Sequence, residues 1–304
     1  MSHLESGLQA WRQMSNHNRM IELQEGAAGQ ASPAIAGDVE IAYFGSSAFR
    51  ITTPLGLTLM VDPWRNYPTG TWNWYFRDFP RVAVDIGVSS HAHFDHDALH
   101  RLDAHVLLDR LIGCYQFADL AITGIAEKHE TDSRRAMYDF KMLIREFQGI
   151  DIEPPNNPRS WDHSLLLIET GGLRIAHWGD NRHNPPPQTW ERLGDVDILL
   201  LPVDASMHVM GYEMAEHVIE TLKPAVVIPH HYYIWDLTVR SSTLLQADEW
   251  VESRDHVRHD GPAHLYRRAD LEKLDRVVHF FGDHVAFDKQ RWRDGELDSV
   301  GLYP

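Results

Sequence analysis

Short apolar runs separated by glycine, proline and polar residues recur along this chain, a pattern typical of strands joined by turns. In the first half they predict strands over residues 39–44, 48–51, 57–61 and 82–88, with a hairpin turn at 54–56. In the second half they predict strands over residues 161–169, 173–178, 197–202 and 225–229. The pattern therefore predicts two strand-rich halves.

Apolar residues at helical spacing predict helices between and after these strands. A largely helical stretch is expected at about 97–150, with Asp97 as its N-cap, and further helices over 213–222 and 243–253. For residues 1–35 the pattern predicts a separate N-terminal appendage, which consists of a short amphipathic helix followed by a Gly/Ala-rich linker.

The segment after the strand at 82–88 concentrates side chains that bind metals. His91, His93, Asp95 and His96 follow the pattern His-x-His-x-Asp-His on a strand-to-helix turn. Imidazole and carboxylate are ligands of catalytic zinc, and burying such a cluster without a metal would cost free energy. A lone His-x-His pair means little in a chain with 20 histidines. The full pattern, however, predicts a metal site, with His91 and His93 facing one ion and Asp95 and His96 facing a second.

This motif after an apolar strand resembles the signature of the metallo-β-lactamase superfamily. The resemblance implies an α+β fold, an αββα sandwich of two mixed sheets flanked by helices, with one or two metals at the edge where the sheets meet. It extends in separate elements over residues 38–235. It implies a single domain over residues 36–304, following the appendage.

Two later segments resemble further ligand elements of this superfamily. In the predicted hairpin, His163 enters one strand and Asp180 leaves the next, so both lie at the same edge of the sheet. The strand at 225–229 leads into His230-His231-Tyr232, which resembles the last ligand element of the lactonase and N-acyl-phosphatidylethanolamine phospholipase D-like branch. That match implies His231 as the ligand and His230 as its neighbour, although the local sequence alone does not separate the two.

The resemblance then implies a dinuclear site with seven ligands. One ion would be held by His91, His93 and His163, and the second by Asp95, His96 and His231, with Asp180 shared. Two divalent ions are expected, Zn²⁺ first, with Mn²⁺ or Fe²⁺ as alternatives. Asp62 is either a turn cap or a support for a metal-bound histidine.

The expected function is a metal-dependent hydrolase that uses a metal-bridging hydroxide to cleave a small ester, lactone or phosphodiester. Asp95 is expected to orient the hydroxide. Tyr232, with His177 and His208, is a candidate donor of the leaving-group proton. His105 and His129 are expected on the surface.

Composition narrows the choice of partners. The net charge of −16 disfavours nucleic acid, since phosphate binding needs basic patches. With Cys114 alone there is no internal disulfide, and neither a signal peptide nor a membrane-spanning apolar run is evident. We expect a soluble cytoplasmic protein acting on a small molecule, and a homo-oligomer is compatible with the sequence.

Three points stay open in the sequence. The same fold could hold two irons for redox chemistry, or a metal could merely stabilise a binding protein. The aromatic loop at 67–76 could pack over the core, lie in a dimer contact or form a wall of the substrate pocket.

Overall fold

Two mixed β-sheets make up the body of the molecule. The computed structural model describes residues 37–67, 70, 73–129, 161–205, 209–239 and 244–298. The first sheet has the strand order β13 (Ala263–Tyr266), β1 (Val39–Tyr43), β2 (Phe49–Thr52), β3 (Thr58–Val61), β4 (Val82–Ser89) and β5 (Leu102–Asp109). Its β13, β1, β2 and β3 pair antiparallel, whereas β3, β4 and β5 run parallel.

The second sheet is larger. Its strand order is β12 (His256–Arg258), β14 (Val277–Phe280), β11 (Val226–His230), β10 (Ile198–Pro202), β9 (Leu173–His177), β8 (His163–Thr170), β7 (Leu120–Glu127) and β6 (Gly113–Phe117). The strands from β12 to β9 are parallel to their neighbours, and those from β9 to β6 are antiparallel. Buried parallel strands read as continuous apolar runs, which explains the unbroken Ile198–Pro202.

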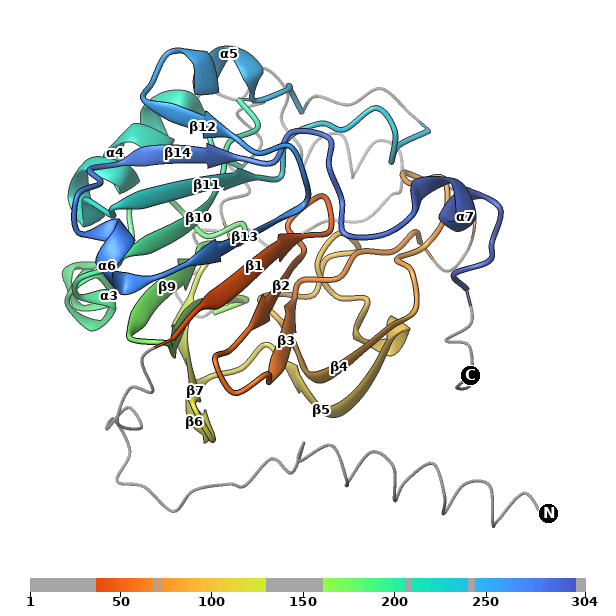
Figure 1. Cartoon of the computed structure of the whole chain (residues 1–304), viewed down its shortest axis with the longest axis horizontal. Helices are drawn as coiled ribbons and strands as arrows, with labels where there is room; N and C mark the ends of the chain where they lie inside the picture. Colours follow the sequence, from red (N-terminus) through yellow and green to blue (C-terminus); the bar gives the residue numbers. More distant parts are fainter. Residues whose placement is uncertain are drawn as a thin grey trace.

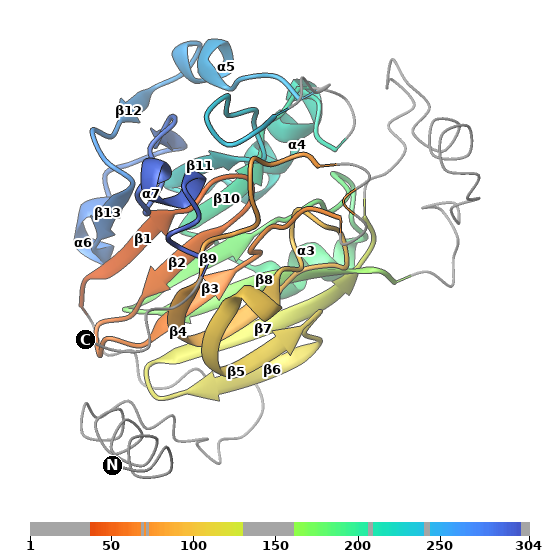
Figure 2. The ribbon, with the colours of Figure 1, turned by 90° about the vertical axis from the view of Figure 1, so that its right-hand side faces the viewer.

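The two sheets lie one over the other, with the core between them (Figures 1 and 2). Phe49 of β2 has its ring centroid 6.1 Å from that of His177 on β9 and 5.8 Å from that of His230 on β11. Apolar side chains from both sheets form one buried cluster. Removing this surface from water is the main favourable term that holds the sheets together.

Short helices cover the sheets and fill the connections between strands. Figure 1 shows α3 (Pro187–Leu193), α4 (Tyr212–Leu222) and α6 (Arg268–Leu271) along one side of the larger sheet. The α4 helix buries Ala215, Val218 and Ile219, whose spacing puts them on one helical face. The other helices of the described part of the chain are η1 (Leu99–Arg101), α5 (Asp248–Glu252) and α7 (Lys289–Arg293). Within the described residues, no helix is long and apolar enough to cross a membrane.

The α+β sandwich of two mixed sheets is confirmed, as are the strands predicted from residue 39 to 88 and from 161 to 229. The helical prediction is wrong for residues 102–127, which form β5, β6 and β7. In β5, partly buried and exposed residues alternate after the buried Leu102, the period of a strand rather than a helix. Residues 1–36 and 130–160 lie outside the described residues, so the appendage and the helix around residues 137–147 stay predictions.

The predicted N-cap at Asp97 is also wrong. The η1 turn has no side-chain cap, and the Asp97 carboxylate instead accepts hydrogen bonds from Arg65 Nε at 2.6 Å and from Nη2 at 2.9 Å. Bidentate pairing with an arginine is a stronger interaction than a cap on a single helical turn.

Gly124 of β7 provides a test of this packing. A Cβ at Gly124 would lie 1.7 Å from the Leu111 carbonyl oxygen and 2.8 Å from Ser164 Oγ. We expect Gly124→Ala to lower the free energy of unfolding by about 1–3 kcal/mol or more, because backbone must move. Gly261→Ala, where a Cβ has nothing within 4 Å, is the matched control and should change it little. Urea unfolding measures both, and equal midpoints for the two variants would contradict this packing.

Candidate metal centre

The His91–His96 segment is a tight turn at the end of β4. The backbone of Ser90 accepts a hydrogen bond from Ser164 N at 2.8 Å, and His91 forms a bridge with His163 at the start of β8. These contacts bring the ligand turn of the first sheet against the second sheet. His91 and His96 are buried, with 1% and 0% of their surface exposed.

Other strand ends of the second sheet point toward this turn. β7 leads to His129, β9 leads through Trp178 and Gly179 to Asp180, and β11 leads to His231. Gly179 has a φ of +53°, and a Cβ there would lie 2.6 Å from His163 Nε2. Only glycine fits this approach, so the Gly-Asp pair is needed to place the Asp180 carboxylate.

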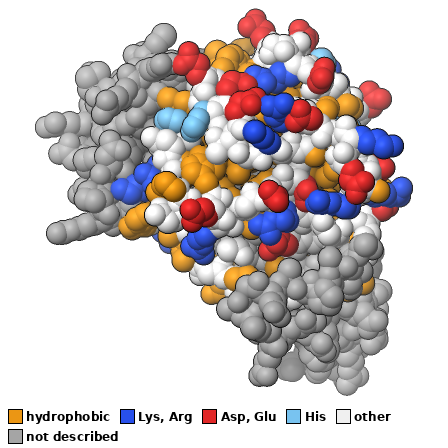
Figure 3. All heavy atoms as spheres, turned by 90° about the vertical axis from the view of Figure 1, so that its left-hand side faces the viewer, with side chains coloured by type: hydrophobic (Ala, Val, Ile, Leu, Met, Phe, Trp, Pro, Cys, Tyr) orange, Lys and Arg blue, Asp and Glu red, His pale blue; other side chains and the backbone are white. Residues whose placement is uncertain are grey.

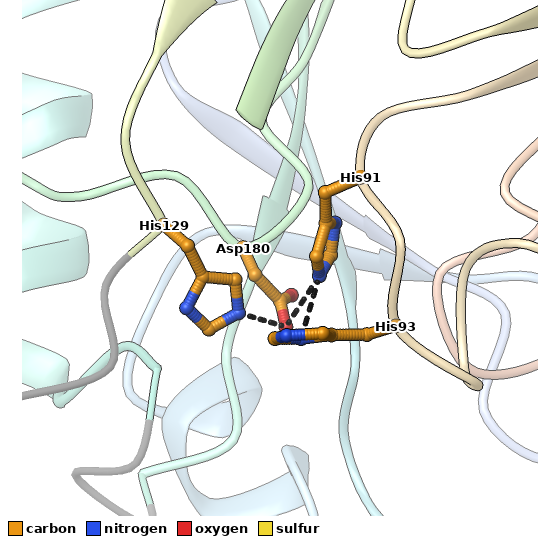
Figure 4. Close-up of side chains that lie close together, drawn as sticks. All are labelled: His91, His93, His129 and Asp180. Atoms are coloured by element: carbon orange, nitrogen blue, oxygen red, sulfur yellow. Dashed lines mark hydrogen bonds and ion pairs between the residues drawn. The ribbon is translucent and has the colours of Figure 1, made fainter. Parts of the chain in front are cut away.

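Two groups of potential ligand atoms share Asp180. In each group, one donor atom per residue lies within 4.8 Å of all the others. The first group is His91, His93, His129 and Asp180, which Figure 4 shows pointing toward one another. The second group is Asp95, His96, Asp180 and His231. A carboxylate between two such groups has the arrangement of a bridging ligand of a dinuclear centre.

The distances from Asp180 are similar on both sides. Its Oδ2 lies 3.3 Å from His129 Nε2, 3.8 Å from His91 Nε2 and 3.6 Å from His231 Nε2. Its Oδ1 lies 3.3 Å from His96 Nε2. Ligand atoms of one zinc ion at about 2.0–2.1 Å are separated by roughly 3.3 Å in a tetrahedron. The spacing therefore fits ligation on either side of Asp180.

Hydrogen bonds behind the ligands fix which nitrogen faces the centre. Asp62 Oδ2 accepts from His96 Nδ1 at 2.8 Å, and Asp204 Oδ2 accepts from His231 Nδ1 at 2.9 Å. Ser90 Oγ donates to Asp62 at 2.7 Å and accepts from His91 Nδ1 at 3.0 Å. Each of the three rings thus keeps its Nε2 lone pair for the centre. Carboxylate–histidine pairs of this kind orient metal ligands.

Two residues of this framework hold an uncommon backbone conformation. Asp62 has a φ of 48° and His231 a φ of 62°, both in the left-handed region without being glycine. Such conformations cost about 1–3 kcal/mol each and concentrate at functional sites. The surrounding hydrogen bonds stabilise them here.

The unpaired atoms of the site fit a metal. Among the described residues, His96 Nε2, Asp180 Oδ1 and both ring nitrogens of His129 are buried without a hydrogen-bond partner. A buried polar atom left unpaired costs about 1–3 kcal/mol, so several facing one another need a common partner. Ligation would engage His96 Nε2, Asp180 Oδ1 and one ring nitrogen of His129, and the residues present therefore fit bound metal.

The charges of the site point the same way. Burial alone would raise the pKa of Asp180, but His231 and His96 hold it well below its usual range. Burial alone would lower the pKa of His231, but Asp180, Asp204 and Asp95 raise it to about 10. The ionised carboxylates therefore need positive charge nearby. Protonated imidazoles supply it in the metal-free chain, and metal ions would take the place of these protons.

The expectation that His129 lies on the surface is wrong. It is 4% exposed and faces His93, with ring centroids 4.5 Å apart. Asp162 accepts a hydrogen bond from its backbone N–H at 3.0 Å, and His129 forms a bridge with Asn181, the residue after Asp180. His105, in contrast, is exposed as expected. If residues 120–127 had been predicted as a strand, His129 would have been a candidate ligand. It follows the end of that strand, at the edge of the sheet where the other candidate ligands lie.

His163 reaches the site but faces it differently from the expectation. Its Nε2 accepts the backbone N–H of Asp180 at 3.1 Å, so that lone pair is engaged. After β11, His231 rather than His230 joins the second group. His230 Nδ1 instead lies 3.1 Å from Ser47 Oγ, and its ring stacks on His177.

Tyr232, the expected donor of the leaving-group proton, is engaged within the core. Its side chain is buried, its hydroxyl donates to Gly282 O at 2.7 Å, and its ring packs 5.2 Å from Phe280. His177 is also held internally, with Nε2 2.8 Å from Asp62 Oδ2. His208 lies outside the described residues.

A pocket opens beside the first donor group. Its volume is about 170 Å³, and its floor is formed by His91, His93, His129 and His163. Arg110, Ile112 and Trp161 line its walls. Within the described residues, no member of the aromatic loop 67–76 lines it. Tyr75 of that loop stacks on Trp64 at 4.1 Å between centroids, so this part of the loop packs over the core.

The family follows from this arrangement together with the sequence. The profile described as "Beta-lactamase superfamily domain" matches residues 40–231, which run from β1 through His231. The chain belongs to the metallo-β-lactamase superfamily. Its sandwich and the position of its ligand turn are those that the motif implied.

Several proteins of this superfamily are similar to the chain. A UPF0173 metal-dependent hydrolase from Anaeromyxobacter sp. (strain K) is 26% identical over 231 residues, covering 66% of this chain and 76% of the relative. Another from Salinibacter ruber is 27% identical over 201 residues, covering 64% and 84%.

Two solved structures share the fold. A metallo-β-lactamase superfamily protein from Thermotoga maritima superposes with a TM-score of 0.55 at 23% identity, covering 80% of this chain and 98% of that one. Igni18, a metallo hydrolase from Ignicoccus hospitalis, gives a TM-score of 0.50 at 18% identity, covering 82% and 97%.

Asp62 tests the supporting hydrogen bonds. Asp62→Asn removes the charge behind His96 and His177, and we expect metal affinity to fall by roughly 10–100-fold while the fold is kept. Competition with a chromophoric chelator measures the affinity. The matched control is Asp119→Asn, because Asp119 is also buried but accepts from Thr53 and Leu55, neither of which belongs to the two donor groups. Equal affinities in the two variants would contradict the role of Asp62.

Proposed function

We propose that this chain is a metal-dependent hydrolase with a dinuclear centre that cleaves a small ester, lactone or phosphodiester. The observation that carries the proposal is the buried carboxylate of Asp180, shared by two groups of histidines in which His96 Nε2 and the ring nitrogens of His129 lack hydrogen bonds. The relatives named as metal-dependent hydrolases support the same class of activity.

The ligand set that we propose differs from the sequence expectation at one position. His91, His93 and His129 would hold the first ion, and Asp95, His96 and His231 the second, with Asp180 between them. His129 replaces His163, whose Nε2 is engaged by the backbone of Asp180. Nitrogen-rich donors with two carboxylates suit Zn²⁺ first, and Mn²⁺ or Fe²⁺ as alternatives.

Two divalent ions, when bound, supply Lewis acidity and lower the pKa of water enough for hydrolysis near neutral pH. The chain's own residues prepare that chemistry. Asp62 and Asp204 fix the rings of His96 and His231, so little reorganisation is needed during the reaction. Asp95 has 18% of its side chain exposed, more than Asp180, and we assign it the orientation of the attacking water.

The pocket favours a small substrate with both apolar and polar character. Ile112 and Trp161 offer apolar walls, and Arg110 offers a guanidinium that already pairs with Asp109. Figure 3 shows acidic and basic side chains interspersed on one face of the molecule, without a continuous basic surface there. Together with the net charge of −16, this favours a small molecule over nucleic acid.

Metal removal tests the activity. We expect the metal-loaded chain to hydrolyse at least one substrate in a panel of esters, lactones and phosphodiesters. Dialysis against chelator should lower that rate by at least about 100-fold, because a metal ion contributes several kcal/mol at about 1.36 kcal/mol per tenfold. Adding back Zn²⁺ or Mn²⁺ should restore it. A rate that does not change on complete metal removal would refute the proposal.

The assignment of His129 has its own test. His129→Ala should lose one equivalent of bound metal by elemental analysis, because the first group loses a ligand. His163→Gln should keep both equivalents, since its side-chain oxygen can still accept the Asp180 N–H. His105→Ala, at an exposed position, is the control for nonspecific loss. The reverse pattern, with metal lost in His163→Gln and kept in His129→Ala, would restore the original ligand set.

A further inference from the structure

A second cluster of histidines lies apart from the dinuclear centre. His259 follows β12, His264 lies on β13 and His279 lies on β14. One nitrogen from each ring lies within 4.8 Å of the other two, and the ring centroids are 4.4, 5.0 and 5.5 Å apart. None of the three belongs to the donor groups around Asp180.

The cluster joins the two sheets. β13 is the end strand of the first sheet, where His264 pairs with Ile41, and β12 and β14 end the second sheet, where His279 pairs with Val257. Figure 2 shows β12 and β13 on the same side of the sandwich. The chain passes from one sheet to the other between His259 and His264, so the three rings meet where it crosses.

The geometry is suited to ligation. His259 Nε2 and His279 Nδ1 lie 3.1 Å apart, close to the roughly 3.3 Å expected for two imidazole nitrogens on one tetrahedral zinc ion. His279 is 7% exposed, whereas His259 and His264 are half-buried. The ring of His259 stacks on Phe281 at 4.9 Å between centroids, which holds that ring in place. Tyr266 OH lies 3.2 Å from His279 Nδ1, and a metal bound at this nitrogen would take the place of that hydrogen bond.

A hydrogen bond between His259 and His279 alone explains only part of the cluster. It accounts for two nitrogens and not for the approach of the third ring. Burial, together with the neighbouring imidazoles, lowers the pKa of His259 to about 4 and of His279 to about 3. The rings are therefore neutral at pH 7, which is the form that binds a metal.

We propose that His259, His264 and His279 form an additional site for a borderline transition-metal dication, Zn²⁺ in the first place, which links β13 to β12 and β14. Three imidazoles without a carboxylate select Zn²⁺, Ni²⁺, Co²⁺ or Cu²⁺ over Mg²⁺ and Ca²⁺. The fourth position is left for water or for a ligand from outside. This site does not depend on the hydrolase activity, because it shares no residue with the other centre.

The test counts metal in the full-length protein. The chain is stripped with chelator, dialysed against micromolar Zn²⁺ and analysed for bound metal per chain. We expect His264→Gln, a change at a half-buried ring, to bind one equivalent less than the unmodified chain. His256→Gln is the matched control, because His256 is an exposed histidine on β12 outside the cluster, and it should bind the full number.

The hydrolase centre provides an internal reference. His264→Gln should keep the metal bound around Asp180 and any hydrolytic rate, so a loss at the cluster is distinct from a failure of the proposed function. Loading with Co²⁺ should likewise show one set of visible absorption bands missing in this variant. If His264→Gln fails to fold, by circular dichroism, His259→Gln replaces it. Equal metal content in the cluster variant and the unmodified chain would overturn the proposal.

Discussion

A buried carboxylate that must be compensated is the constraint on which this structure depends. Asp180 is 1% exposed, and its charge could not be kept there without neighbouring positive charge or a metal. Four histidines from three separate segments, His91, His96, His129 and His231, lie within 3.8 Å of its oxygens. The ends of β4, β7, β9 and β11 are therefore brought to one place, and the two sheets are held together at that edge.

The hydrogen bonds around the ligands extend this constraint into the core. Asp62 accepts from Ser90, His96 and His177, so one carboxylate joins the end of β3 to the ligand turn and to β9. Glu127 plays a comparable part at β7, where it is fully buried and accepts from Arg182 at 2.7 Å and Thr189 at 2.8 Å. Because Arg182 lies two residues after Asp180, this pair fixes His129 and Asp180 as one unit.

The sequence was sufficient to predict those residues of the candidate site that lie next to the end of a predicted strand. The His-x-His-x-Asp-His pattern, the Gly179-Asp180 pair and His231 were identified from residues next to strand ends, and the structure brings them together. His129 was missed because the apolar residues of 120–127 were interpreted as helical, although Ile122, Thr123 and Ile125 are β-branched and favour a strand. The contacts of the Tyr232 side chain could not be predicted, because side-chain direction depends on packing that the local sequence does not determine.

The histidine cluster at β12–β14 could not have been found from spacing at all. His259, His264 and His279 are separated by 5 and 15 positions, and only the pairing of end strands from two sheets brings them together. Contacts of this kind depend on the whole topology rather than on any segment.

In the pocket beside the centre, the residues of the walls are distinct from the residues that would hold and orient the metal. Ile112 and Trp161 are 53% and 55% exposed, and neither side chain takes part in the hydrogen bonds that orient the ligands. Substitutions at these walls would leave the floor of histidines untouched. On the proposed function, substrate preference could therefore change through these walls without any change in the residues that would hold the metals.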